Sequence, residues 1–110
     1  MRDTIFLALG SLCFLAAAGL AYAADTQPAS VTIDNFSFNQ ASLTVKAGTR
    51  VTWTNRDDIP HTVVDADDPK AMKSPPLDTG EQFEHTFAKA GTFHYFCSLH
   101  PHMQGTIVVQ

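Results

Sequence analysis

The sequence contains little cysteine and few basic residues. Its 110 residues include 2 cysteines, and 7 lysine and arginine residues stand against 11 aspartate and glutamate residues, for a net charge of −4. A chain without a basic stripe lacks the electrostatic basis for binding nucleic acid. The mild acidity is compatible with docking to a basic partner, but a solvated soluble surface is the favoured explanation.

Long apolar runs are confined to the N-terminus. Residues 5–20 form such a run, which follows a short charged segment and precedes Ala21-Tyr22-Ala23, a small-x-small cleavage pattern. A membrane span needs about 20 apolar residues, and this run is shorter and interrupted by glycine. We therefore expect residues 1–23 to be a cleaved secretory signal peptide and residues 24–110 to form one domain. The mature protein is expected to be periplasmic and soluble, without stable membrane insertion.

Removal of this leader takes away Cys13 and leaves Cys97 as a lone cysteine. Cysteines of exported proteins normally pair as disulfides, so an unpaired thiol requires an explanation. Burial of the thiol beneath a bound metal is one such explanation. Because no internal disulfide can form, we expect the metal to contribute to the stability of the domain.

The mature segment shows no convincing helical period. It consists of short segments rich in β-branched and aromatic residues separated by turn signals, which is typical of an all-β sandwich or barrel. We expect strands at residues 31–36, 42–46, 51–55, 61–65, 81–87, 92–96 and 105–109. Residues 65–80 carry three prolines and many polar residues, so we expect an irregular loop there, with at most a short helical turn at 70–73.

The most informative stretch is the segment between the last two expected strands. Cys97, His100 and Met103 recur there at intervals of three. Pro101 argues against a helix because proline removes a backbone donor, so we expect a tight loop that turns the three side chains toward one point. Thiolate and thioether groups select Cu(I) or zinc, and imidazole suits copper, zinc and iron. A cysteine, two histidines and a weak axial methionine form the ligand set of electron-transfer copper sites, and His61, directly after Pro60, is the candidate for the second histidine.

These residues resemble the cupredoxins, the small blue copper proteins. The Cys-x-x-His-x-x-Met spacing is most similar to that of amicyanins, and the approach to Cys97 and the Asn55 to His61 segment also match this amicyanin- and plastocyanin-like group. The resemblance implies a Greek-key β-sandwich of seven to eight strands that holds one type 1 copper ion. It implies His61, Cys97, His100 and Met103 as the metal ligands, with His61 bound through Nδ1 and Met103 as the long axial ligand.

The resemblance also implies roles for residues around the ligands. Asn55 is expected to brace the turn before His61 and to donate a hydrogen bond to the sulfur of Cys97, and Pro60 to fix the backbone that aims His61. The ring edge of His100 is expected to reach an apolar surface patch that serves as the electron port. Residues named as candidates for that patch are Leu99, Pro101 and Met72.

The other three histidines are not expected to be ligands. His102 and His94 are predicted to be exposed, His94 because it is out of phase with Tyr95 and Cys97. His85 is in phase with Phe83 and Phe87, so it is predicted to be partly buried and hydrogen-bonded.

The function that this resemblance implies is that of a carrier of single electrons, cycling between Cu(II) and Cu(I). Its partners would be exported redox proteins, such as a c-type cytochrome or a periplasmic dehydrogenase or oxidase, and the carrier itself is expected to be a monomer. Four protein ligands leave no open position for a substrate, which argues against an enzyme.

Two other functions are compatible with parts of the pattern. The first is copper storage, delivery or sensing, which usually relies on exposed clusters of exchangeable ligands, whereas the only methionines after the leader are Met72 and Met103. The second is a thiol enzyme in which Cys97 is the nucleophile and His61 or His100 the base. That reading lacks a recognisable nucleophile turn and leaves Met103 unexplained.

Overall fold

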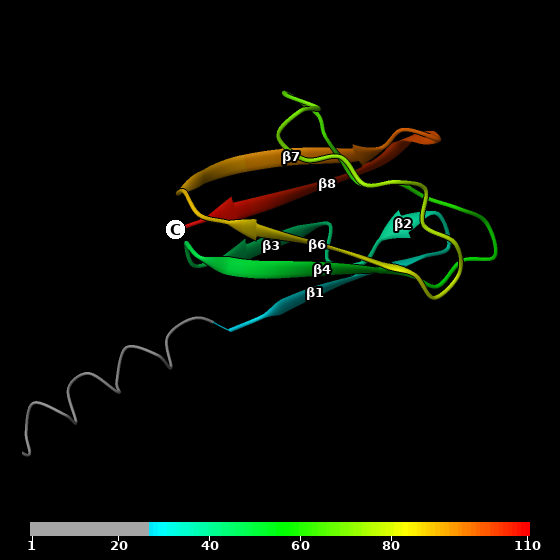
Figure 1. Ribbon diagram of the computed structural model, residues 1–110, viewed down its shortest axis with the longest axis horizontal. Helices are drawn as coiled ribbons and strands as arrows, with labels where there is room; N and C mark the ends of the chain where they lie inside the picture. The colour runs from blue at the N-terminus through cyan, green and yellow to red at the C-terminus, as the bar shows by residue number, and fades with distance from the viewer. Residues whose placement is uncertain (1–26) are drawn as a thin grey trace, which may run out of the picture.

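The structure, a computed structural model, describes residues 27–110 (Figure 1). These residues form eight strands and no helix, so nothing among them is a helix long and apolar enough to cross a membrane. The predicted signal peptide, residues 1–23, lies outside the described part of the chain. The strands are β1 (Ala29–Asp34), β2 (Ser37–Phe38), β3 (Ser42–Val45), β4 (Thr49–Asn55), β5 (Val64–Asp65), β6 (Gln82–Phe87), β7 (Gly91–Cys97) and β8 (His100–Val109).

The strands pack as two four-stranded sheets with the orders β2-β1-β4-β6 and β3-β8-β7-β5. Strands β1 and β4 pair in parallel, as do β3 and β8, and the other neighbours are antiparallel. The chain therefore passes repeatedly from one sheet to the other, and both sheets are mixed. The prediction of an all-β sandwich of seven to eight strands in one domain is confirmed.

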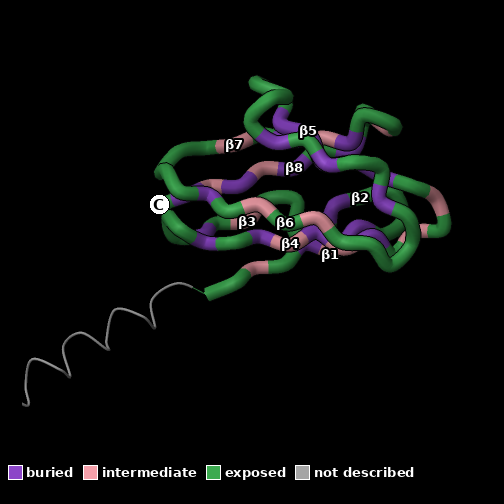
Figure 2. Tube along the Cα trace, viewed as in Figure 1, coloured by how far each residue is buried: buried purple, intermediate pink, exposed green. Residues whose placement is uncertain are grey.

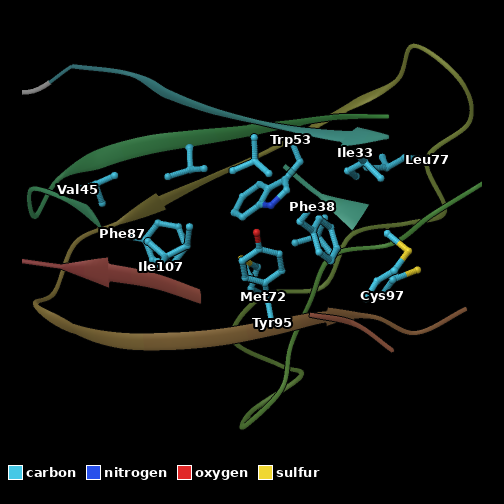
Figure 3. Close-up of a cluster of buried hydrophobic side chains, with 14 of the residues drawn as sticks. Ile33, Phe38, Val45, Trp53, Met72, Leu77, Phe87, Tyr95, Cys97 and Ile107 are labelled. Carbon is cyan, nitrogen blue, oxygen red and sulfur yellow. The ribbon is translucent and has the colours of Figure 1, made fainter. Parts of the chain in front are cut away.

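Alternation of side chains along the strands builds the core between the sheets. In β4 the side chains of Val51, Trp53 and Asn55 are all fully buried, as the period of two predicts, whereas Arg50, at an alternate position of the same strand, is exposed. Trp53 from one sheet meets Tyr95 of β7 from the other, with ring centroids 5.3 Å apart (Figure 3). Figure 2 shows buried residues alternating with less buried ones along the strands.

Two of the predicted strands differ most in length from the sequence prediction, and the short strand β2 was not predicted. Only residues 64–65 of the expected strand 61–65 form a strand, because the backbone of His61 and Val63 bonds instead to the long loop that follows β5. His61 and Leu77 exchange hydrogen bonds of 3.1 and 2.7 Å, and the amide of Ser74 donates to the carbonyl of Val63. The last strand is longer than predicted and begins at His100 rather than at Gly105.

The loop between β5 and β6 is irregular, as expected. At the place of the suggested helical turn, the amide of Ala71 donates to the carbonyl of Asp68 in a single turn. The β1–β2 turn, the chain leaving β4 and the β7–β8 turn all lie at one end of the sandwich, opposite the C-terminus (Figure 1). Segments far apart in sequence therefore meet at this end.

Candidate metal centre

Three of the predicted ligands meet at this end of the sandwich. His61, Cys97 and His100 each offer a donor atom, and these atoms lie within 4.8 Å of one another. The sulfur of Cys97 is 3.7 Å from Nδ1 of His61 and 3.8 Å from Nδ1 of His100. Cys97 and His61 are fully buried and His100 is partly exposed. Both imidazoles thus turn their Nδ1 atoms toward the sulfur.

These separations fit a shared metal ion. Typical bond lengths, taken from zinc sites, are about 2.3 Å to sulfur and about 2.1 Å to an imidazole nitrogen. Around one ion at an angle of 120°, such bonds would place sulfur and nitrogen about 3.8 Å apart. The observed distances of 3.7 and 3.8 Å match that value. The thiolate and two imidazoles are donors that suit copper.

An irregularity in the β7–β8 hairpin brings the candidate ligands Cys97 and His100 together. Phe96 pairs with Gln104, whereas Cys97 pairs with His100, so the three residues 101–103 have no partner on β7. The tight loop expected from the sequence is thus a turn at Ser98 and Leu99 followed by a bulge at the start of β8. Its last residue, Met103, is 4% exposed and belongs to the same buried cluster as Cys97. Its place in that cluster is compatible with the predicted axial role, which stays a prediction.

The sulfur of Cys97 lies among hydrogen-bond donors. The amide of Thr62 donates to Sγ over 3.3 Å, and the hydroxyl of Thr62 is 3.7 Å away. Burial by itself would raise the pKa of this thiol, but hydrogen bonds from Thr62, His61 and His100 outweigh it and lower the pKa to about 6. The surroundings therefore favour the thiolate, which is the form that binds a metal.

Asn55 has one of its two expected roles. Its Nδ2 group donates to the carbonyls of Ile59 and Leu77, each over 2.8 Å, and its Oδ1 accepts from the amide of Asp57. These bonds brace the turn before His61, which also contains Pro60. The expected donation to Cys97 is wrong, because both Nδ2 protons are used by carbonyl groups and the amide of Thr62 bonds to the sulfur instead.

The second ring nitrogen of His61 contacts a residue that sequence analysis did not single out. Nε2 lies 2.8 Å from Oδ2 of Asp57. Burial acts to raise the pKa of the Asp57 carboxyl, but hydrogen bonds from the Phe36 amide, the His61 ring and the Asn35 amide outweigh it and hold this pKa below its ordinary value. The carboxylate is therefore ionised at neutral pH.

The apolar surface beside His100 differs in membership from the expectation. Leu99 is 47% exposed and Pro101 is exposed, as predicted, but Met72 is only 4% exposed and belongs to the core. Met72 is buried because its carbonyl bonds to the amide of Asp65 and holds the loop against the sandwich. Phe36, at 53% exposed, takes its place. A bulky apolar residue directly after Asp34-Asn35, a pair typical of turns, was the signal that could have revealed it.

The remaining histidines lie outside the cluster. His102 and His94 are exposed, as predicted, and Nδ1 of His94 is 3.2 Å from the hydroxyl of Thr106. His85 is half-buried, as predicted, but its side chain forms none of the expected hydrogen bonds with the described residues, and its ring packs edge-on against Phe87 at a centroid distance of 4.8 Å. Burial lowers the pKa of His85, with a smaller opposing effect from Asp65.

Comparison with known proteins identifies the family. Residues 5–109 match the model of the cupredoxin-like domain. The chain belongs to the cupredoxin family. It is 35% identical over 100 residues to amicyanin-alpha of Methylorubrum extorquens, an alignment that covers 86% of this chain and 84% of the relative. It is 38% identical over 84 residues to a plastocyanin of Scenedesmus fuscus, which covers 66% and 86% of the two chains.

A solved structure supports the same assignment for this cupredoxin. An oxidised mutant of amicyanin superposes with a TM-score of 0.71 at 35% sequence identity, covering 76% of this chain and 82% of the other. The family assignment and the His-Cys-His cluster together confirm the prediction of a copper centre.

Proposed function

We propose that this cupredoxin is a type 1 copper protein that carries single electrons between exported redox proteins. The observation that carries the proposal is the meeting of one buried thiol and two imidazole Nδ1 atoms, at sulfur–nitrogen distances of 3.7 and 3.8 Å. His61, Cys97 and His100 would hold the ion, with Met103 as the weak axial ligand. When bound, the copper supplies the one-electron couple.

The residues around the ion suit transfer of an electron rather than catalysis of a reaction. Four protein ligands leave no open coordination position, so no substrate binds the metal. His61 and Cys97 are 0% exposed, so the partly exposed imidazole of His100 is the route between the metal and a partner. The fold alone does not decide between carrier and enzyme, because one fold hosts many functions.

The surface around His100 suits close approach of another protein. Phe36 and Leu99 are the two large apolar side chains exposed among the described residues, and Pro101, close to Leu99 in the chain, is also exposed. Apolar side chains lose little hydration energy when a partner covers them. The partners would be proteins such as a c-type cytochrome or a periplasmic dehydrogenase or oxidase, and the carrier would act as a monomer.

The decisive experiment is the visible absorption spectrum of the mature protein after addition of Cu(II). We expect an intense thiolate-to-copper charge-transfer band and a reversible one-electron couple. Cys97→Ala should abolish the band, whereas His102→Ala should keep it, because His102 lies two residues from His100 but outside the donor cluster. A protein that binds Cu(I) and shows no such band after oxidation would refute the proposal and favour copper storage or delivery.

A further inference from the structure

The side chain of Asp57 joins two parts of the molecule that have different roles. One oxygen, Oδ2, lies 2.8 Å from Nε2 of His61 and accepts the amide of Phe36 over 2.9 Å. The other oxygen, Oδ1, accepts the amide of Asn35 over 2.6 Å. One carboxylate thus contacts an imidazole of the donor cluster and both amides at the tip of the β1–β2 hairpin.

The backbone of Asp57 is itself held in place. Its amide donates to Oδ1 of Asn55 over 2.8 Å, and its carbonyl accepts the hydroxyl proton of Thr79. The side chain is only 11% exposed. A carboxylate fixed in this way loses little freedom when it forms its hydrogen bonds, so it is suited to orient the groups that it contacts.

The contact with Asp57 determines which nitrogen of His61 carries a proton. An ionised carboxylate only accepts hydrogen bonds, so Nε2 of His61 carries a proton. Nδ1 faces the sulfur of Cys97 at 3.7 Å and is therefore the nitrogen that gives up its proton when a metal binds. A carboxylate on the far nitrogen also makes the imidazole a more basic ligand.

The hairpin tip that Asp57 holds is an unfavourable turn for its sequence. Asp34 pairs with Ser37, and the two residues between them, Asn35 and Phe36, have φ values of 54° and 57°. Two successive positive φ values define a type I′ turn, which favours asparagine and glycine and is rare for phenylalanine. The two amide bonds to Asp57 stabilise this turn.

The turn places an aromatic ring against both imidazoles. The ring of Phe36 stands edge-on to His61 at a centroid distance of 5.7 Å and to His100 at 5.3 Å. More than half of Phe36 remains exposed. A backbone strain that persists at a surface phenylalanine beside two candidate ligands points to a role for that position.

We propose that Asp57 is a positioning residue that fixes the tautomer and orientation of His61 and, through the same carboxylate, holds Phe36 over His61 and His100. The proposal rests on the proposed function for its effect on copper, but the arrangement of Asp57, His61 and Phe36 is testable without the metal. Its negative charge next to a ligand favours Cu(II) over Cu(I), so Asp57 also lowers the reduction potential.

The matched variants are Asp57→Asn and Asp58→Asn. Both remove one negative charge at neighbouring positions, but Asp58 is exposed and makes none of the contacts described above. In the metal-free protein, proton–nitrogen correlation spectra of the imidazoles should show the Nε2–H form of His61 in the wild type and in Asp58→Asn. Asp57→Asn should show a mixture of tautomers, at least tenfold faster exchange of the Phe36 amide, and weaker ring contacts between Phe36 and His100.

With copper bound, Asp57→Asn should lower the affinity for Cu(II) about 10- to 100-fold, the range typical when a partner of a ligating histidine is lost. The affinity for Cu(I) should fall less, and each tenfold difference between the two raises the potential by about 59 mV. Asp58→Asn should leave the potential close to that of the wild type. Asp57→Glu, which keeps the charge, should recover part of the wild-type potential.

Two results would overturn the proposal. One is a metal-free Asp57→Asn protein that keeps the wild-type tautomer of His61 and the wild-type exchange rate of the Phe36 amide. The other is an equal shift of the reduction potential in Asp57→Asn and Asp58→Asn. That result would mean that loss of a nearby negative charge, and not loss of the contact with His61, changes the potential. If the wild type does not form a blue copper site at all, the proposed function fails, and the tautomer and amide-exchange measurements still decide the role of Asp57.

Discussion

The lowered pKa of Cys97 predicts that the stability of the metal-free protein depends on pH. The pKa of this thiol falls from 9.0 to about 6, because hydrogen bonds from Thr62, His61 and His100 outweigh the burial that would raise it. A thiol whose pKa is lower in the folded state than in the unfolded chain stabilises the fold when it is ionised. This contribution is fully present above pH 9 and is lost as the pH falls through 6.

The size of the effect follows from the shift. Each pKa unit corresponds to about 1.36 kcal/mol, so the shift from 9.0 to about 6 corresponds to about 4 kcal/mol. Small domains have unfolding free energies of about 5–15 kcal/mol. The thiolate is therefore expected to supply a large part of the stability of the metal-free protein at high pH.

The assay is urea denaturation of the metal-free wild type and of Cys97→Ser at several pH values from 5 to about 9.5, a range chosen to bracket both pKa values. Serine is close to cysteine in shape and does not ionise in this range. The difference in unfolding free energy between the two proteins should increase as the pH rises from about 6 to 9 and become constant below and above. The ultraviolet absorbance of the thiolate should titrate with a midpoint near pH 6. A midpoint at the ordinary value, or a difference independent of pH, would show that the donors around Sγ do not favour the thiolate.

Two further predictions concern the fold and the leader. A Cβ added at Gly105 would overlap the ring of Tyr95 opposite it and come within 2.7 Å of Cε1, so Gly105→Ala should destabilise the protein by about 3 kcal/mol, the upper part of the usual overpacking range. The cost should be clearly smaller in a Tyr95→Leu background, and an equal cost in both backgrounds would contradict the steric explanation. Protein recovered from the periplasm should begin at Ala24 or Asp25 by intact mass, and a mass that retains residues 1–23 would refute cleavage.

Much of the fold was predictable because short-range patterns determine it. The alternation of Val51, Trp53 and Asn55 identified the inner face of β4. The two strands around Cys97 were recognisable from their aromatic and β-branched residues. The region of His61 was misassigned as a strand, because its hydrogen-bond partners come from the loop near Leu77, and no local pattern indicates such a pairing.

The candidate ligands carry a clearer sequence signal than their surroundings. Cys97, His100 and Met103 carry a spacing signal in one short segment, and His61 was found by its resemblance to a known motif. Thr62 and Asp57 carry no such signal, because their roles arise from contacts across long stretches of chain. The Thr62 amide contacts a sulfur 35 positions away, and Asp57 contacts amides 21 and 22 positions away.

The way in which each candidate ligand is held supports the proposed carrier over a storage protein. His61 is fixed by Asp57 on one side and by backbone bonds to Leu77 on the other. Cys97 receives the Thr62 amide, and His100 is tied to Cys97 by strand pairing. Because these contacts belong to the protein itself, the positions of the ligands do not depend on the charge of the ion. A site that keeps its geometry when one electron is added or removed has a low reorganisation energy. A low reorganisation energy is a requirement for fast electron transfer. Release of copper would require these contacts to break, so the same rigidity disfavours rapid delivery of the metal.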